Sequence, residues 1–79
     1  MKLGIYRHYK GNRYHVIGMA RHSETLEELV VYQALYGDHG LWVRPASMFQ
    51  ERIDNDDKMV ERFEFEYSNL DKAPKVNGD

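Results

Sequence analysis

Apolar and polar residues alternate along several short stretches of this chain, which is the pattern of half-buried β-strands. In the clearest stretch, residues 62–67, Phe63, Phe65 and Tyr67 alternate with charged residues and are expected to point inward. Residues 3–10 and 13–22 are rich in Tyr, Ile and Val, and β-branched and aromatic residues recur at 29–36 and 41–45. The pattern therefore predicts five strands.

The bends between these strands set the predicted faces of the sheet. Gly11-Asn12 suits a two-residue type II′ turn, which places His8 opposite His15 and Tyr9 opposite Tyr14. A one-residue slip would exchange the two faces. The residues expected to point inward are Ile5, Tyr9, Tyr14, Val16, Gly18 and Ala20, and those expected to point outward are Tyr6, His8, Lys10, Arg13, His15, Met19 and Arg21.

Residues 37–40 form a second predicted hairpin turn, which pairs Gln33 with Arg44. Because both of these side chains need water, Trp42 is expected to share the outer side with Arg44. Pro45 is expected to end the strand, since it cannot donate a ladder hydrogen bond. The inward residues are then Val30, Tyr32, Ala34, Leu41 and Val43.

The remaining segments are predicted to be connections. Residues 23–28 suit a single helical turn or tight loop, with a helix reaching Tyr36 as the alternative. Residues 46–50 suit one 3₁₀ turn, residues 54–58 an acidic loop, and residues 68–79 a flexible tail. The interpretation is one domain, residues 1–67, in which consecutive antiparallel strands close into a small, mostly β, SH3-like barrel. The alternative is an open meander sheet that dimerises to protect its edges.

The composition limits the function more than it identifies one. The chain has 79 residues, 42% of them hydrophobic and 30% charged, which fits one globular domain. The absence of cysteine excludes disulfides, thiolate catalysis and cysteine-containing zinc sites. No apolar run approaches the ~18 residues of a membrane span, and no signal-peptide pattern is present. We expect a cytoplasmic monomer or homodimer without cofactor or membrane contact.

Aromatic and basic residues form the first candidate site. Trp and Arg are enriched at binding hot spots, so Trp42 and Arg44 on one outward face predict a module that recognises a peptide, a partner protein or a small anion. The alternative for Trp42 is packing beneath a loop. Exposed backbone amides beside Arg21 would extend the site, because they can hold an anion. The predicted ligand-binding residues are Arg21, His22, Ser23, Thr25, Trp42 and Arg44.

The first 22 residues carry five basic side chains and no acidic one, although the net charge is −2. Interleaved aromatic and basic side chains on a β-surface can hold single-stranded nucleic acid. The alternative hypothesis is therefore weak nucleic-acid binding by the first hairpin through Tyr6, Arg7, Lys10 and Arg13. Against it stands a pI near 6.0. The favoured explanation of the charge asymmetry is two complementary halves of one barrel that attract each other.

Histidine or serine chemistry is the least favoured hypothesis. His8 opposite His15 would lie within ~5 Å at Cβ, but a metal site needs a third ligand, and His22 points to the other side of the strand. Residues 21–24 contain the residue types of a catalytic triad, yet strand neighbours point apart and no nucleophile elbow is present. The sequence favours a protein that is neither an enzyme nor a metal-binding protein.

Short ordered motifs run through most of the chain. They are His8-Tyr-Lys-Gly11, Tyr14-x-Val16, Ala20-Arg-His-Ser-Glu-Thr25, Val30-Val-Tyr-Gln-Ala-Leu-Tyr-Gly37, Leu41-Trp-Val-Arg-Pro45 and Met48-Phe49. Together they resemble a bacterial family of small proteins, Domain of Unknown Function 1653. The resemblance implies an SH3-like, mostly β domain with no assigned activity. Members of that family tend to carry a glycine turn before the last strand, where this chain has Asp54-Asn-Asp-Asp-Lys-Met59.

Overall fold

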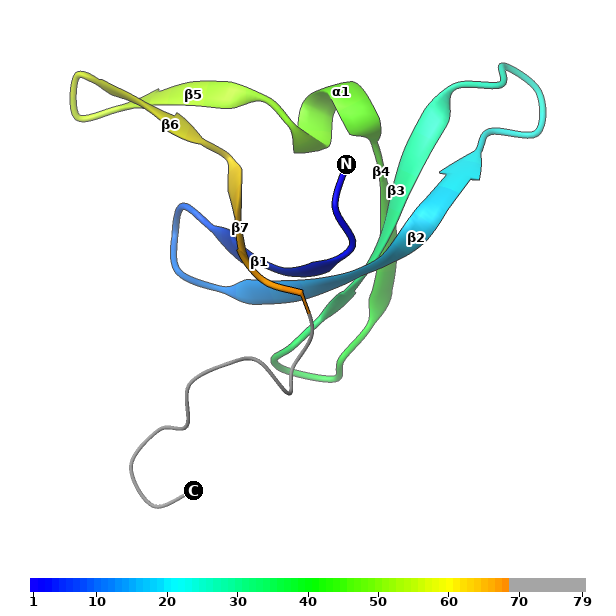
Figure 1. The fold of residues 1–79 in the computed structure, drawn as a ribbon, viewed down its shortest axis with the longest axis horizontal. Coiled ribbons are helices and arrows are strands. Elements are labelled where there is room, and N and C mark those ends of the chain that lie inside the picture. Colours follow the sequence, from blue (N-terminus) through cyan, green and yellow to red (C-terminus); the bar gives the residue numbers. More distant parts are fainter. Residues whose placement is uncertain (69–79) are drawn as a thin grey trace.

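The computed structural model describes residues 1–68, which form a mostly β protein (Figure 1). Five strands make one antiparallel sheet in the order β4-β3-β2-β1-β7, and β5 and β6 form a separate hairpin. The mostly β class is confirmed, whereas the predicted tail lies outside the described residues except for Ser68. The elements are β1 (Gly4–His8), β2 (Arg13–Arg21), β3 (Glu28–Ala34), β4 (Leu41–Pro45), α1 (Ala46–Phe49), β5 (Arg52–Asn55), β6 (Lys58–Glu61) and β7 (Phe63–Tyr67).

The large sheet is curved but not closed. Figure 1 shows α1 and the β5–β6 hairpin on the side towards which the sheet curves. Strands β4 and β7 are its two edges and do not pair with each other within residues 1–68, so barrel closure stays a prediction. The short turn predicted at residues 46–50 is present, but Gln50 N–H donates to Ala46 O in an α-helical rather than a 3₁₀ bond. None of the helical segments in this range is long and apolar enough to cross a membrane.

Aromatic rings build most of the core on the concave face of the sheet. Phe49 of α1 is 1% exposed and stacks on Phe63 of β7 with ring centroids 4.0 Å apart and an interplanar angle of 4°. This stack ties the single helical turn to the edge of the sheet. The buried cluster consists of Tyr6, Val16, Val30, Tyr32, Ala46, Phe49 and Phe63, with Tyr14 and Phe65 packed against it.

The predicted register of the first hairpin is wrong. Strand β1 pairs with β2 so that Ile5 lies opposite His15 and Tyr6 opposite Tyr14. The connecting loop is longer than two residues, because His8 N–H donates to Asn12 O across it at 2.7 Å. This shift buries Tyr6, which was expected to point outward, and removes Tyr9 from the strand pair.

A bulge in β2 reverses which side chains at the end of this strand point to the concave face of the sheet. The pairing with β3 shifts between Val16 and Gly18, so Met19 lies opposite the buried Val30. Met19 and Arg21 therefore share the concave face with Val30, and the predicted inward direction of Gly18 and Ala20 is wrong. A β-bulge inserts one unpaired residue, which reverses the alternation beyond it.

The second hairpin also has a longer turn than predicted. Ala34 N–H donates to Gly40 O, and the register places Trp42 opposite Tyr32 and Arg44 opposite Val30. Trp42 and Arg44 consequently lie on the concave face with the core, rather than on the outer face. Leu41 and Val43 lie on the convex face, where both remain exposed.

Two connections complete the fold. The loop at residues 23–27 contains a tight turn, as predicted, and the alternative of a helix reaching Tyr36 is wrong. The acidic segment forms the turn of the β5–β6 hairpin, whose strands were not predicted. Asp56 and Asp57 at this turn have φ angles of 54° and 64°, the left-handed backbone that a type I′ turn requires.

Candidate binding site

Trp42 and Arg44 lie at a small pocket on the concave side of the β4 edge. Its lining residues are Tyr14 of β2, Tyr32 of β3, Tyr36 of the following turn, and Trp42 and Arg44 of β4, around a volume of about 210 Å³. The exposed pair predicted from sequence thus lies beside three tyrosines that were not assigned to a site. The tyrosines could not be recognised in advance, because the predicted registers placed Trp42 and Tyr32 on opposite faces.

The three tyrosines form a connected wall of this pocket. Tyr14 packs edge-to-face against Tyr32 and Tyr36, with centroids 5.4 and 5.6 Å apart. The hydroxyls of Tyr14 and Tyr36 are 2.7 Å apart. Burial and this hydrogen bond raise the pKa of Tyr14 to about 12, so its hydroxyl keeps its proton at neutral pH. The wall therefore offers ring surfaces and neutral hydroxyl groups.

Arg44 supplies positive charge at the same pocket. Its Nε donates to Tyr32 Oη at 3.4 Å, and its guanidinium lies over the Phe63 ring, 5.6 Å from the centroid. The ion pairs within residues 1–68 are Arg13–Glu66 and Arg62–Glu51, so no described carboxylate neutralises Arg44. Trp42 beside it is 58% exposed, so no loop within residues 1–68 covers it, contrary to the alternative of a tryptophan packed beneath a loop.

The loop residues of the predicted site lie elsewhere on the molecule. Arg21 pairs with Glu28 at the start of β3, whereas Trp42 pairs with Tyr32, four residues further along that strand. Four strand residues span about 13 Å, and Figure 1 shows the two connecting loops at opposite ends of β3. The structure therefore does not bring Arg21 and its loop together with Trp42.

Internal hydrogen bonds occupy the backbone amides of that loop. His22 Nδ1 accepts from the N–H groups of Glu24 and Thr25 at 3.1 and 3.3 Å, and Thr25 Oγ1 accepts from Glu27 N–H at 3.2 Å. His22 and Thr25 thus have local roles that order the loop. Ser23 is exposed at its tip. The amides of Glu24, Thr25, Leu26 and Glu27, which were expected to hold an anion, therefore already have partners.

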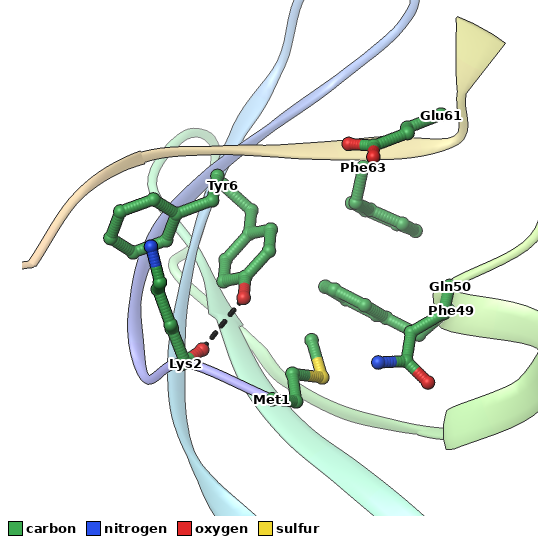
Figure 2. Close-up of a pocket in the computed structure, with 8 residues that line it drawn as sticks. Met1, Lys2, Tyr6, Phe49, Gln50, Glu61 and Phe63 are labelled. Carbon is green, nitrogen blue, oxygen red and sulfur yellow. Dashed lines mark hydrogen bonds between the residues drawn. The ribbon is translucent and has the colours of Figure 1, made fainter.

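A second cavity, of about 300 Å³, lies between the N-terminal segment, α1 and the end of the sheet. Figure 2 shows aromatic rings around it, with the Glu61 and Gln50 side chains nearby. The Tyr6 hydroxyl donates to Lys2 O at 2.7 Å, and burial, followed by the charge of Glu61, raises the pKa of Tyr6. The lining residues are Met1, Lys2, Tyr6, Phe49, Gln50, Glu61, Phe63 and Phe65.

The basic first hairpin is partly neutralised by β7. Arg13 forms an ion pair with Glu66 in which the shorter N–O distance is 2.7 Å. Arg7 lies opposite Glu64 in the strand register, although the two side chains form no ion pair within residues 1–68. Tyr6 is buried. Lys10 lies over the ring of Tyr9, with its ammonium 5.8 Å from the centroid. These contacts leave less free cationic and aromatic surface than the sequence indicated.

The histidines of the weak metal hypothesis are not opposed. His15 faces Ile5, and His8 pairs with Phe63 of β7. His8 Nδ1 accepts from Lys10 N–H at 3.1 Å, and burial, followed by the positive charges of Arg62, Arg44 and Lys10, lowers the pKa of His8. No group of three His, Asp or Glu side chains suited to a metal ion occurs within the described part of the chain.

Comparison with known proteins identifies the family but no activity. The family model described as "Protein of unknown function (DUF1653)" matches residues 4–65. The crystal structure of a DUF1653 protein from Bordetella bronchiseptica is similar, with 34% sequence identity, 95% of each chain covered and a TM-score of 0.81. A search of the curated proteins gives no match. The chain therefore belongs to the DUF1653 family, as its ordered motifs predicted.

Proposed function

We propose that this protein is a small binding module whose site is the pocket of Tyr14, Tyr32, Tyr36, Trp42 and Arg44. Its ligand is an anionic group, a carboxylate or a phosphate, attached to an apolar or aromatic body. The single observation that carries this proposal is the exposed Trp42 beside a guanidinium that has no described carboxylate partner.

The chemistry of the pocket supports this class of ligand. A guanidinium presents a planar set of donors that matches a carboxylate or phosphate, and the indole N–H is a further donor. The rings of Trp42 and the tyrosines give an apolar surface that would pack against the body of the ligand. A volume of about 210 Å³ fits one side chain or one small molecule. An acidic or C-terminal residue of a peptide would meet these requirements.

The proposal can be tested by titrating isotope-labelled protein with phenylacetate and phenyl phosphate while recording amide and indole NMR signals. Trp42 is the only tryptophan, so its indole N–H gives one assignable signal. We expect this signal and the Arg44 side-chain signal to shift at millimolar probe. Benzamide should shift them less, because it has no charge, and benzylamine should not bind beside Arg44.

Matched arginine variants provide the control. Arg44→Gln should abolish the shifts caused by both anions, whereas Arg52→Gln, at an exposed arginine of β5, should leave them unchanged. A short single-stranded oligonucleotide serves as a further probe for the first hairpin. Shifts confined to the cavity of Figure 2 or to the first hairpin, or an Arg44→Gln variant that binds like the parent protein, would contradict the proposed site.

A further inference from the structure

The free edge of β4 exposes three consecutive uncharged residues. Leu41, Trp42 and Val43 are 64%, 58% and 59% exposed, and among residues 1–68 β4 has a partner strand on one side only. Strand edges that are free, apolar and uncharged are ready to pair with another strand, and proteins usually protect them with charge or cover. The exposure of this tripeptide on both faces of the sheet therefore requires an explanation.

The hydrogen-bond pattern identifies which backbone groups of β4 are free. Ala34 N–H donates to Gly40 O, which makes Ala34 and Gly40 a hydrogen-bonded pair. Opposed pairs alternate along an antiparallel ladder, so Trp42 and Arg44 also direct their backbone groups towards β3. The N–H and C=O groups of Leu41 and Val43 then point away from the sheet. Pro45 lies at a free position too, where its missing N–H removes no bond to β3.

We infer that this edge pairs with the same edge of a second copy of the chain. An antiparallel β4–β4 pair with its two-fold axis at Trp42 places Leu41 opposite Val43 of the second copy, and Val43 opposite Leu41 of the second copy. Because these are the residues with free backbone groups, each of the two pairs exchanges two hydrogen bonds. The result is a continuous ten-stranded sheet with an isologous interface.

This register gives every exposed side chain of the tripeptide a partner. Leu41 and Val43 form two apolar cross-strand pairs on the convex face. Trp42 meets Trp42 of the second copy on the concave face, in a pair without hydrogen bonds, where side chains approach most closely. The two pockets of Tyr14, Tyr32, Tyr36, Trp42 and Arg44 then adjoin across the axis. The second copy thus adds an indole to each proposed site.

The other edge of the sheet does not support the same arrangement. Self-pairing of β7 about Phe65 would place Glu64 opposite Glu66 of the second copy, twice. Like charges directly opposite each other destabilise a strand pair. Glu66 is also engaged by Arg13. Charge therefore disfavours β7 self-pairing, whereas nothing charged lies between Leu41 and Val43, and β4 is the edge selected for self-association.

The first experiment measures mass against concentration by analytical ultracentrifugation. A tripeptide interface is small, so we expect micromolar rather than nanomolar affinity and a rise towards twice the 9.4 kDa mass of the chain. Val43→Lys should keep the protein monomeric, because two ammonium groups would lie against the apolar pairs. Met59→Lys changes an equally exposed residue of β6 and should dimerise like the parent protein.

The register is tested by disulfide trapping, because the chain contains no cysteine. Cα atoms of an antiparallel pair without hydrogen bonds are about 4.5 Å apart, within the range of a disulfide. Trp42→Cys should therefore oxidise rapidly to a covalent dimer. Leu41→Cys should oxidise more slowly, because Leu41 lies opposite Val43 of the second copy rather than opposite Leu41.

The possible outcomes separate this inference from the proposed function. A protein that stays monomeric at millimolar concentration, a dimer that survives Val43→Lys, or equal oxidation of the two cysteine variants would overturn the β4–β4 pair. An extended peptide that pairs with β4 while the protein alone stays monomeric would also overturn it. Binding of phenylacetate to the monomeric Val43→Lys variant would leave the anion pocket intact, since the dimer inference does not depend on that ligand.

Discussion

The two edges of the sheet differ in how many of their side chains are buried or paired within the fold. At β7, Phe63 is buried in a ring stack and Glu66 is paired with Arg13. At β4, Leu41, Trp42 and Val43 are mostly exposed, and Arg44 has no described carboxylate partner. The β7 edge therefore contributes to the core and to an ion pair, whereas apolar, aromatic and cationic groups of the β4 edge stay exposed or lack a described partner. Such exposed groups are expected at a surface that binds something else.

The largest expected effect is at the β7 edge. Phe63→Ala removes the ring that stacks on Phe49 and contacts Tyr14 and Tyr32, and we expect it to lower the free energy of unfolding by about 3–5 kcal/mol. Urea denaturation followed by circular dichroism measures the loss. If the variant is unfolded without urea, Phe63→Leu gives a smaller loss that remains measurable. An equally large loss of stability from Trp42→Ala would contradict the view that β7 side chains stabilise the fold more than those of β4.

The second-largest expected loss of stability comes from a close backbone contact between β1 and β7. Gly4 has a φ of 138°, and a β-carbon there would collide with the carbonyl oxygen of Tyr67. Gly4→Ala should therefore cost about 2–3 kcal/mol, because it forces strain where β1 and β7 approach closely. The same urea titration measures it. Gly40→Ala at the β4 end, where φ is not positive and only side-chain atoms are near, should cost less, and the reverse order would contradict this interpretation.

Acid should weaken the β7 side through His8. Its pKa in the folded protein lies below the ordinary value of 6.5, chiefly because of burial. The unfolded chain therefore takes up the proton first as the pH falls. The contribution of His8 to stability is complete above pH 6.5 and is lost as the pH falls through the folded pKa. The free energy of unfolding, measured across this range, should therefore decrease as the pH is lowered. His8→Gln should make this decrease smaller. An unchanged decrease in that variant would exclude His8 as its source.

The smallest expected effect is that of the exposed ion pair. Arg13→Ala breaks the contact with Glu66, and the half-exposed Arg13 side chain limits the loss to about 0.5 kcal/mol or less. Thermal unfolding at low and high salt measures it, and the difference from the parent protein should shrink as salt rises. A larger or salt-independent loss would show that the pair acts through packing rather than through charge.

The sequence predicts which segments form strands and turns better than it predicts the register in which the strands pair. The alternation around Phe63 and Phe65, the short turn after Pro45 and the two first hairpins can all be inferred from local patterns. The registers could not be, because they depend on loops longer than the glycine signals suggest, such as the one closed by His8 and Asn12. The one local signal of the β2 bulge is Gly18 inside a strand pattern, and the predicted register did not use it.

Only part of the candidate site was predicted, because the rest of it depends on the strand register. Trp42 and Arg44 lie two residues apart on one strand, so they share a face in any register, and their proximity was predictable. Their neighbours were not, because Tyr14, Tyr32 and Tyr36 approach them only through the observed pairings. Arg21 and Thr25 were included in the prediction only because of the chemistry of their side chains. The length of β3 separates them from Trp42.

The separate β5–β6 hairpin has a consequence for handling the protein. A two-stranded hairpin is marginally stable by itself, so its amide protons should exchange with solvent sooner than those of β1, β2 and β3. Its tip at Asp56 and Asp57 is exposed and should be the first site of protease cleavage among residues 1–68. The same tip is where an inserted tag or new chain ends would be tolerated, leaving the β4 edge unobstructed for study.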